Sequence, residues 1–301
     1  MRVEFANAII KHHTTVANQV FITGDLGFMA LEQVRDTFGK HFINAGVAEQ
    51  NMVSVSAALA SEGFIPWIYS ISPFTTLRPY EQLRNDVCHH NLPVKVVGNG
   101  GGYGYGIMGA THHNLEDIGS MRLLPGMRVY IPFNGDDVEQ CVKQMLADKA
   151  PNYLRLNLAA KTDTEVESFS QWRRLKKGSK KTIVIGTGPV VANLFQLDAE
   201  ILNELEIWLM SIFPVVNLPK EFIDSLKEKQ TVITMEEHSG QCSLYETMAA
   251  QLLANGCGHV KYNGLYSNGY PSGKYGNQTW HQAENNLHGE NLKNKILAYL
   301  K

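Results

Sequence analysis

The sequence predicts an α/β protein that consists of two parallel-sheet domains. Short β-rich runs alternate with segments of helical character through most of the 301 residues. Strands separated by helices form parallel βαβ units, whose sheets are covered on both faces. The alternation stops between residues 159 and 181, which are polar and basic without an apolar period. Because 301 residues exceed one ordinary domain, we interpret this break as an interdomain connection.

The first predicted domain comprises residues 1–160 and the second residues 181–301, with a linker at 161–180. In the first domain we predict strands at 19–25, 41–46, 65–70, 93–99, 128–133 and 152–158 and helices at 48–61, 81–90 and 136–147. In the second domain we predict strands at 181–188, 206–212 and 230–237 and a helix at 244–254. The basic run WRRLKKGSKK, residues 172–181, is interpreted as part of a solvated linker.

The composition is typical of a globular protein. Apolar residues make up 44% of the chain and charged residues 19%, which is ample for a buried core. The net charge of -2, without a long basic block, argues against a nucleic-acid partner. No apolar run reaches the ~18 residues that suggest a membrane span, and the sequence opens without a signal-peptide pattern. The four cysteines lack metal-ligand or C-x-x-C spacing, so we expect reduced thiols and a cytoplasmic protein.

One carboxylate interrupts the apolar segment FINAGVAEQNMVSVSAALASEG, residues 42–63. Glu49 lies in the first turn of the helix predicted there, before an apolar run whose inward stripe we expect to include Met52, Val55 and Leu59. An acidic residue in a first turn interacts favourably with the helix dipole, by about 0.3–1 kcal/mol. The pattern alone therefore leaves a purely structural role for Glu49 open.

A glycine-rich loop, GNGGGYGYGIMGATHHN, spans residues 98–114 after a predicted strand. No helix begins at its third glycine, which argues against a dinucleotide fingerprint. We expect its glycines to let the backbone pack closely around a ligand or a partner. His112 and His113 are adjacent and should point to different sides, so a joint metal site is not expected. A single histidine here is either structural or a general acid/base.

A further short motif is GDLG, residues 24–27, with Asn44 downstream. It is similar to a magnesium–diphosphate motif, but that motif requires a glycine where this chain has Leu26. We therefore exclude a diphosphate site of that kind, and we predict no metal ligands in this chain.

Three segments resemble, in their order, the C-terminal half of transketolase and the matching part of deoxyxylulose-phosphate synthase. They are GVAEQNM at 46–52, IYSISPFTTLRPYEQLRND at 68–86 and GYGIMGATHH at 104–113, and the resemblance covers nearly the whole chain. The family binds thiamine diphosphate. The resemblance implies a thiamine-diphosphate pyrimidine-binding fold followed by a transketolase C-terminal domain.

The resemblance also implies roles for single residues. Glu49 matches a glutamate that hydrogen-bonds a ring nitrogen of the cofactor's aminopyrimidine and thereby promotes loss of the thiazolium proton. Phe74 matches the aromatic residue that stacks on that ring. Ile71 and Leu77 stand where transketolases often have further aromatic residues, so we expect a more aliphatic wall.

Two further residues are implied near the reacting atoms. His112 matches a histidine that contacts the cofactor's amino group and substrate oxygens, and Asp25 matches an aspartate near the thiazolium. The Gly-Asp-Gly motif that grips magnesium and the diphosphate in whole transketolases does not occur in this sequence. The chain therefore resembles one subunit of a split transketolase. We expect an N-terminal partner subunit that holds Mg²⁺ and the diphosphate, in an α2β2 complex.

The acceptor side departs from the family pattern. Met108 stands where transketolases have an aspartate that recognises a substrate hydroxyl, and Ile107 replaces a neighbouring acid. Uncharged residues replace the phosphate-contacting histidine, arginine and serine, in this order: Gly100, Leu158 and Met29. Only Arg2 matches a phosphate-site arginine. Since a phosphate dianion requires cationic donors, we expect an acceptor larger or less acidic than a pentose 5-phosphate, such as a nucleotide-linked sugar.

The implied function is transfer of a two-carbon ketol unit from a ketose donor to a carbonyl acceptor. The alternative is a 2-oxo acid dehydrogenase β subunit, which shares the architecture and the glutamate but takes a 2-oxo acid donor. LRPYEQLRND at 77–86 and GATHH at 109–113 fit transketolase better. A third interpretation is a non-catalytic module with a decayed site, and the retention of Glu49, Phe74 and His112 argues against it.

Overall fold

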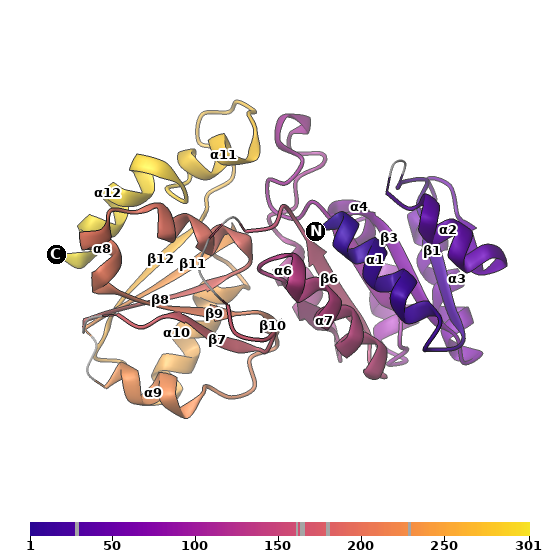
Figure 1. Ribbon diagram of the computed structural model, residues 1–301, viewed down its shortest axis with the longest axis horizontal. Coiled ribbons are helices and arrows are strands. Elements are labelled where there is room, and N and C mark those ends of the chain that lie inside the picture. Colours follow the sequence, from indigo (N-terminus) through magenta and orange to yellow (C-terminus); the bar gives the residue numbers. More distant parts are fainter. Residues whose placement is uncertain (28–29, 161, 163–165, 179–180, 228–229) are drawn as a thin grey trace. The chain divides into compact units, whose positions relative to one another are not determined.

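The computed structural model describes the chain except residues 28–29, 161, 163–165, 179–180 and 228–229 (Figure 1). It contains two compact units, Met1–Gly104 with Ala110–Ala159, and Tyr105–Gly109 with Ala160–Lys301. Each unit is built on a largely parallel β-sheet, which confirms the predicted α/β fold class. The predicted limits of the domains and the linker remain predictions. Within the described residues, no helix is long and apolar enough to cross a membrane.

The sheet of the first unit brings the carboxyl ends of its parallel strands to one edge. Its strands are β1 (Gln19–Thr23), β2 (Phe42–Asn44), β3 (Ile65–Ile71), β4 (Lys95–Asn99), β5 (Arg128–Tyr130) and β6 (Asn152–Leu156). They lie in the order β5-β6-β4-β3-β1-β2, and these neighbours run parallel. β1, β3, β4 and β6 are almost entirely buried, as expected for strands covered on both faces. In such sheets, ligands bind beyond the carboxyl ends of the strands.

Helices cover this sheet. They are α1 (Arg2–His13), α2 (Glu32–Phe38), α3 (Glu49–Ser61), α4 (Ser72–Thr76), α5 (Tyr80–Gln82), α6 (Asp117–Arg122) and α7 (Gly135–Ala147), with the 3-10 turn η1 (Gly39–His41) and the π-helical turn η2 (Leu83–Cys88). α1 packs beside α2 and α7 (Figure 1), whereas α3 packs on β3 and η2. The helix predicted at 81–90 is therefore divided between α5 and the wider η2.

The inward face of α3 differs from the predicted stripe. Met52 is fully buried, but Val55 is 38% exposed and Leu59 is only half-buried. The buried residues are Glu49, Met52, Val53, Ser56, Ala57 and Ala60. They follow the helical spacing i, i+3, i+4, i+7, i+8 and i+11 counted from Glu49. The carboxylate is therefore itself the first member of the buried stripe, which hydrophobicity alone cannot indicate.

The second unit has its own sheet. Its strands are β7 (Trp172–Lys176), β8 (Thr182–Thr187), β9 (Leu205–Met210), β11 (Thr231–Ser239) and β12 (Lys261–Ser267), in the order β12-β11-β8-β9-β7. β7 is antiparallel to β9, and the other pairs are parallel. The remaining elements are β10 (Ile212–Phe213), α8 (Ala199–Glu204), α9 (Lys220–Leu226), α10 (Leu244–Ala254), α11 (Gln278–Glu284), α12 (Gly289–Leu300), η3 (Gly106–Met108) and η4 (Pro189–Gln196).

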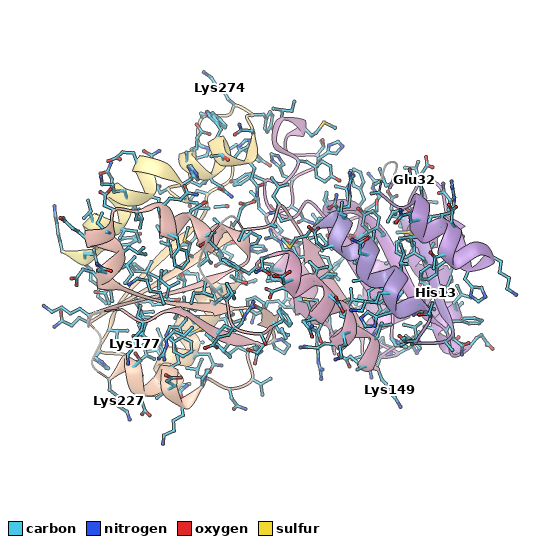
Figure 2. All side chains as sticks on the ribbon, viewed as in Figure 1. His13, Glu32, Lys149, Lys177, Lys227 and Lys274 are labelled. Atoms are coloured by element: carbon cyan, nitrogen blue, oxygen red, sulfur yellow. The ribbon has the colours of Figure 1, made fainter. Side chains whose placement is uncertain are left out.

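The basic run at 172–181 is not a solvated linker throughout, because Trp172–Lys176 forms β7 at the edge of this sheet. Alternate side chains of β7 are buried, as the period of a strand requires. Arg173 is 1% exposed and donates from Nη2 to Ser211 Oγ at 3.2 Å. Lys177, just past the strand, is exposed (Figure 2). A charge run can thus contain an edge strand when one of its arginines is hydrogen-bonded inside.

Three glycines of this loop make room for the chain's own side chains: Gly98 at the end of β4, and Gly101 and Gly104 after it. A Cβ on Gly98 would lie 2.6 Å from the Tyr153 hydroxyl oxygen, and one on Gly101 would lie 2.5 Å from Arg155 Nε. A Cβ on Gly104 would lie 2.8 Å from a side-chain oxygen. The space above these glycines is therefore filled, and they do not open a roomy pocket.

A buried polar network fills that space. Arg155 Nε donates to Asp117 Oδ2 at 2.8 Å, and the Tyr153 hydroxyl donates to the same oxygen at 2.7 Å. Ser72 Oγ lies 2.9 Å from the Tyr153 hydroxyl and accepts from Asn114 Nδ2 at 2.9 Å. Burial and the Asp117 charge raise the pKa of Tyr153 well above its ordinary value, so the phenol stays a donor. The network joins β6, the start of α4 and the end of the glycine loop.

Lys95, the first residue of β4, has a fully buried side chain that ends in an ionisable amine. Its Nζ donates to the carbonyl oxygens of Asp148 at 2.7 Å and Ala150 at 3.0 Å, and to Asn152 Oδ1 at 2.7 Å. Burial lowers the pKa of Lys95 to about 7, although the Asp148 carboxylate opposes the shift.

We expect the free energy of unfolding to rise with pH above 7 because of Lys95. Below pH 7 the ammonium is charged in both states and its burial cost is fully present. Above pH 7 only the folded state loses the proton, so stability should increase by up to about 1.4 kcal/mol per pH unit until the unfolded pKa is approached. Urea unfolding between pH 6 and 9 measures this slope.

Lys95→Met should remove the slope. Lys149→Met, which changes an exposed lysine (Figure 2), is the matched control and should retain it. A wild-type slope equal to that of Lys95→Met would show that Lys95 stays charged inside the fold.

Candidate active site

Glu49 is the first residue of α3 and lies at the carboxyl edge of the first sheet. It is 2% exposed. A Cβ on Gly24, the residue after β1, would lie 3.7 Å from Glu49 Cγ, so the carboxylate is next to the backbone that leaves β1. Its position in the first turn of α3 offsets part of the cost of burying a charge, because the helix dipole favours an anion there.

Asn44, the last residue of β2, fixes the loop that leads to Glu49. Its Nδ2 donates to Asp25 Oδ1 at 2.9 Å, and its Oδ1 accepts from the backbone N–H groups of Asp25 at 3.2 Å and Gly46 at 2.9 Å. Gly46 has φ 69°, in the left-handed region that favours glycine. The side chains of the GDLG motif and Asn44 therefore join the ends of β1 and β2 and determine where α3 begins.

Phe74, His112 and Arg78 gather beside Glu49. The Phe74 and His112 rings meet edge to face, with centroids 5.6 Å apart at 61°. The Arg78 guanidinium carbon lies 4.0 Å from the centre of the Phe74 ring. Arg78 Nη1 donates to Glu49 Oε1 at 2.7 Å. The structure thus brings the predicted residues Glu49, Phe74 and His112 into one cluster that Arg78 links.

The turn after β3 positions Phe74 and Arg78 on one side. α4 begins at Ser72, which the buried Asp117 network holds. Pro79 disfavours helical backbone at the residue before it, so Arg78 ends this turn, with its N–H bonded to the Pro73 carbonyl at 3.1 Å. Residues four apart on a helical turn face the same way, which directs the guanidinium of Arg78 over the ring of Phe74.

Aliphatic side chains flank α4. Ile71, the last residue of β3, is 6% exposed, and Leu77, at the end of α4, is 43% exposed. Their side chains are aliphatic where transketolases often have aromatic residues, and their contact with a cofactor remains a prediction.

The two adjacent histidines have different environments. His112 is half-buried, and its Nδ1 lies 2.9 Å from Thr111 Oγ1. His113 is 4% exposed, and its ring meets that of Tyr103 edge to face at 5.3 Å. Across the described part of the chain, no group of three or more His, Cys, Asp or Glu residues is placed to hold a metal ion.

The residues present fit an aminopyrimidine ring. Ser70 is fully buried, and its Oγ has no hydrogen-bond partner among the described residues. This hydroxyl is next to Gly24, whose ideal Cβ would lie 3.4 Å from it and 3.7 Å from Glu49 Cγ. The site therefore combines an aromatic face, a carboxyl group and an unused hydroxyl. A flat ring with both donors and acceptors matches this set.

Asp25 lies in a separate cleft of about 450 Å³ at the carboxyl ends of β1 and β2. The described residues that line it are Thr23, Asp25, Leu26, Gly27, Leu31, Glu32, Arg35, Phe42 and Asn44. Glu32 extends from α2 toward the outside of the unit (Figure 2). Asp25 has φ 57° and is held by Asn44. Asp25 is therefore not a member of the cluster around Glu49. It lies next to that cluster, because Gly24, the residue before it, is beside Glu49.

The residues predicted on the acceptor side belong to both units. Arg2 is exposed at the start of α1. The start of this helix lies near the end of β6, where the Met1 nitrogen donates to the Asn157 carbonyl at 3.3 Å. Leu158 is 64% exposed in the same unit. Met108 and its neighbour Ile107 belong to η3 in the second unit and are 54% and 76% exposed, in that order. Gly100 has φ 73°, and Met29 lies outside the described residues.

Sequence reasoning missed three residues of this site. Arg78 has a detectable signal, because it follows Phe74 by four residues and precedes a proline. Asn44 has a weaker one, as an asparagine at the end of a predicted strand. Ser70 has none, since only the burial of its hydroxyl distinguishes it.

Comparisons with known proteins agree with this geometry. Residues 1–160 match the family "Transketolase, pyrimidine binding domain". A chain of Methanocaldococcus jannaschii, provisionally named transketolase C-terminal section, is 31% identical over 268 residues, which cover 85% of this chain and 83% of that one. A 6-deoxy-6-sulfo-D-fructose transketolase subunit of Clostridium sp. (strain MSTE9) is 30% identical over 220 residues, covering 71% and 68%. An apulose-4-phosphate transketolase subunit of Phocaeicola vulgatus is 28% identical over 246 residues, covering 79% and 78%.

A solved structure shares the fold along almost its full length. It is a split gene transketolase described as an inactive beta4 tetramer, with a TM-score of 0.82 and 22% identity over 99% of this chain and 97% of that chain. The family match and the relatives confirm the resemblance found in the sequence. The chain therefore belongs to the transketolase family of thiamine-diphosphate-dependent transferases, and it corresponds to a subunit of the split type that carries the pyrimidine-binding domain.

Proposed function

We propose that this chain works in a two-subunit transketolase, which transfers a two-carbon ketol unit from a ketose donor to a carbonyl acceptor. The observation that carries this proposal is the buried carboxyl group of Glu49 beside the face of Phe74, with His112 at the edge of the same ring. The reaction class is supported by relatives whose names are transketolase subunits.

The side chains of the cluster have distinct proposed roles. Bound thiamine diphosphate supplies the electron sink for breaking and forming the carbon–carbon bond. Glu49 hydrogen-bonds a ring nitrogen of the aminopyrimidine and shares a proton with it. Phe74 stacks on the ring, and Ile71 and Leu77 form its aliphatic wall. His112, oriented by the Thr111 hydroxyl at 2.9 Å, donates to substrate oxygens.

Glu49→Gln should leave the fold intact and slow the first chemical step. The amide can still accept from Arg78, and a first-turn charge contributes only about 0.3–1 kcal/mol. Loss of the shared proton should slow proton exchange at the thiazolium carbon by about 10²–10⁴-fold, the usual contribution of acid–base catalysis. Deuterium exchange of the cofactor in the assembled complex measures this rate.

Glu62→Gln is the matched control, because Glu62 is exposed at the other end of α3. It should exchange the cofactor proton at the wild-type rate. An unchanged rate in Glu49→Ala would show that Glu49 does not activate the cofactor.

The proposed partner is an N-terminal subunit that holds the diphosphate and Mg²⁺. Apolar side chains near the site are exposed in this chain: Val47 is 75%, Leu77 43% and Ile43 37% exposed. Contact with a second subunit would bury them. A related split transketolase forms an inactive assembly of β subunits alone, which fits a chain that supplies only part of the site. By analogy with dimeric transketolases, we propose an α2β2 complex.

The purified chain alone should bind thiamine diphosphate weakly and show no turnover, because a ligand site at an interface needs both of its walls. Titration calorimetry with cofactor and Mg²⁺, followed by the same titration after adding the partner subunit, measures the difference. Tight binding by the isolated chain would contradict the divided site. Turnover of a 2-oxo acid in place of a ketose would assign the complex to the 2-oxo acid dehydrogenase type instead.

The proposed acceptor differs from a pentose 5-phosphate. Arg2 is the one cationic residue that this chain has at the family's phosphate positions, whereas Gly100 and Leu158 are uncharged and Met29 lies outside the described residues. Leu158 is exposed and apolar, and Gly100 has no side chain. The filled loop glycines give no support for a roomy pocket, so the proposal rests on charge alone. An unpaired phosphate dianion against such residues is unfavourable. A nucleotide-linked sugar or another modified intermediate therefore remains the proposed class.

We expect ribose 5-phosphate and xylulose 5-phosphate to be poor substrates of the assembled complex. Steady-state kinetics with both sugars gives the test. A kcat/KM of about 10⁴ M⁻¹s⁻¹ or more would make the complex a conventional split transketolase. Two relatives are named for a sulfonated sugar and for a sugar 4-phosphate, so anionic sugars of both kinds belong in the substrate panel.

We also propose a cytoplasmic location. None of the four cysteines forms a disulfide: Cys88, Cys141, Cys242 and Cys257. Reduced cysteines are typical of a reducing compartment.

A further inference from the structure

Arg78 contacts both surfaces that the cofactor ring is proposed to use. Its guanidinium carbon lies 4.0 Å from the centre of the Phe74 ring, over the ring face. Its Nη1 donates to Glu49 Oε1 at 2.7 Å. A guanidinium is planar and delocalised, so it stacks on an aromatic face much as a flat ring does. One side chain therefore makes both the stacking contact and the carboxyl hydrogen bond.

We propose that Arg78 occupies the aminopyrimidine position in the cofactor-free chain and leaves it when thiamine diphosphate enters. This inference rests on the proposed function, because it takes Glu49 and Phe74 as the residues that receive the ring. The proposal places the ring on the face of Phe74 that Arg78 covers, because Arg78 reaches the Glu49 carboxyl group from that face. The two flat groups cannot share that face.

The side chain of Arg78 is free to leave without disturbing the turn that carries it. It is 43% exposed, so it has a direct route to solvent. The backbone of Arg78 is fixed separately, by the bond from its N–H to the Pro73 carbonyl at 3.1 Å and by the proline that follows. Rotation of side-chain torsions alone therefore opens the position.

Displacement of Arg78 exchanges one partner of Glu49 for another. Glu49 is 2% exposed, and an isolated buried carboxylate is strongly unfavourable. The Arg78 guanidinium supplies the compensating charge. In the loaded site, a proton taken up from solvent and shared with the ring nitrogen replaces it. Arg78 thus keeps the carboxyl group paired until the ring arrives, at the expense of cofactor affinity.

Arg78→Met tests this directly, because methionine has no charge and no flat face. If the blocking conformer is populated to about 90%, its removal should tighten the apparent Kd of thiamine diphosphate about tenfold. Calorimetric titration of the apo complex with cofactor and Mg²⁺ measures the Kd without turnover. Arg78→Lys keeps a charge beside Glu49 and removes the flat group, so it should also bind more tightly than wild type. Arg84→Met is the matched control, since Arg84 is exposed and its Nη1 donates to the neighbouring Asn85 side chain at 2.8 Å.

A second measurement uses the full chain without cofactor. Urea unfolding of Arg78→Met, Glu49→Gln and the double variant should give non-additive changes in the free energy of unfolding, whereas Arg84→Met with Glu49→Gln should be additive. Additivity of the first pair would overturn the pairing of Arg78 with Glu49 in the empty chain.

Unchanged or weaker cofactor binding by Arg78→Met would overturn the proposal. Weaker binding would indicate that Arg78 is itself a ligand of the cofactor. Failure of the proposed function gives a different pattern. In that case Glu49→Gln and Phe74→Ala would also bind thiamine diphosphate as the wild-type complex does.

Discussion

The first unit must bury a carboxylate at the start of a helix, and much of its local structure serves this one requirement. Glu49 is the first residue of the buried stripe of α3, so the helix cannot pack without taking the charge inside. The dipole of α3 favours an anion at this end. Asn44 fixes the turn before the helix, and Arg78 provides the compensating cation. Small residues at positions 56, 57 and 60 let the remainder of the stripe approach the sheet.

A second buried charge pair holds the elements that face Glu49. Arg155 and Asp117 are 3% and 0% exposed, and their ion pair is completed by the Tyr153 hydroxyl. Removing one member of such a pair costs about 3–5 kcal/mol. The same network bonds Ser72, from which α4 carries Phe74, and Asn114, two residues after His112. Phe74 and His112 are therefore both close in the chain to residues of this network. Gly98 and Gly101 have no room for a side chain because Tyr153 and Arg155 of the network fill the space above them.

Apolar periodicity was sufficient to predict the buried strands but not the polar contacts. The runs that became β1 and β3 are mostly apolar and buried on both faces, so hydrophobicity marks them. β4 and β6 were also predicted, although they contain the buried cation-forming residues Lys95 and Arg155. β7 escaped because one of its two buried residues is Arg173, whose contact with Ser211 joins residues 38 positions apart. α1 also escaped, since only four of its residues are buried. Glu49, Phe74 and His112 were found by resemblance, and the structure brings them together.

The contact between Arg78 and Glu49 could not be predicted from the sequence for a related reason. Arg78 and Glu49 are 29 residues apart, and no period connects an exposed arginine before a proline with a carboxylate at a helix start. The resemblance indicates which residues a cofactor would contact. It does not show which of the chain's own side chains contacts them, because that depends on tertiary approach.

A site divided between two chains places a physical demand on each half. Before assembly, each chain must be stable with its share of the binding groups uncovered, although some of those groups are polar and buried. Glu49 cannot remain as an unpaired buried anion, and Arg78 is its partner within the chain. Any internal partner then competes with the cofactor, and the measured affinity becomes the difference between two sets of contacts. Arg78 is well suited to that task because a half-exposed cation pairs strongly enough to stabilise the carboxylate, yet loses little when water replaces the contact.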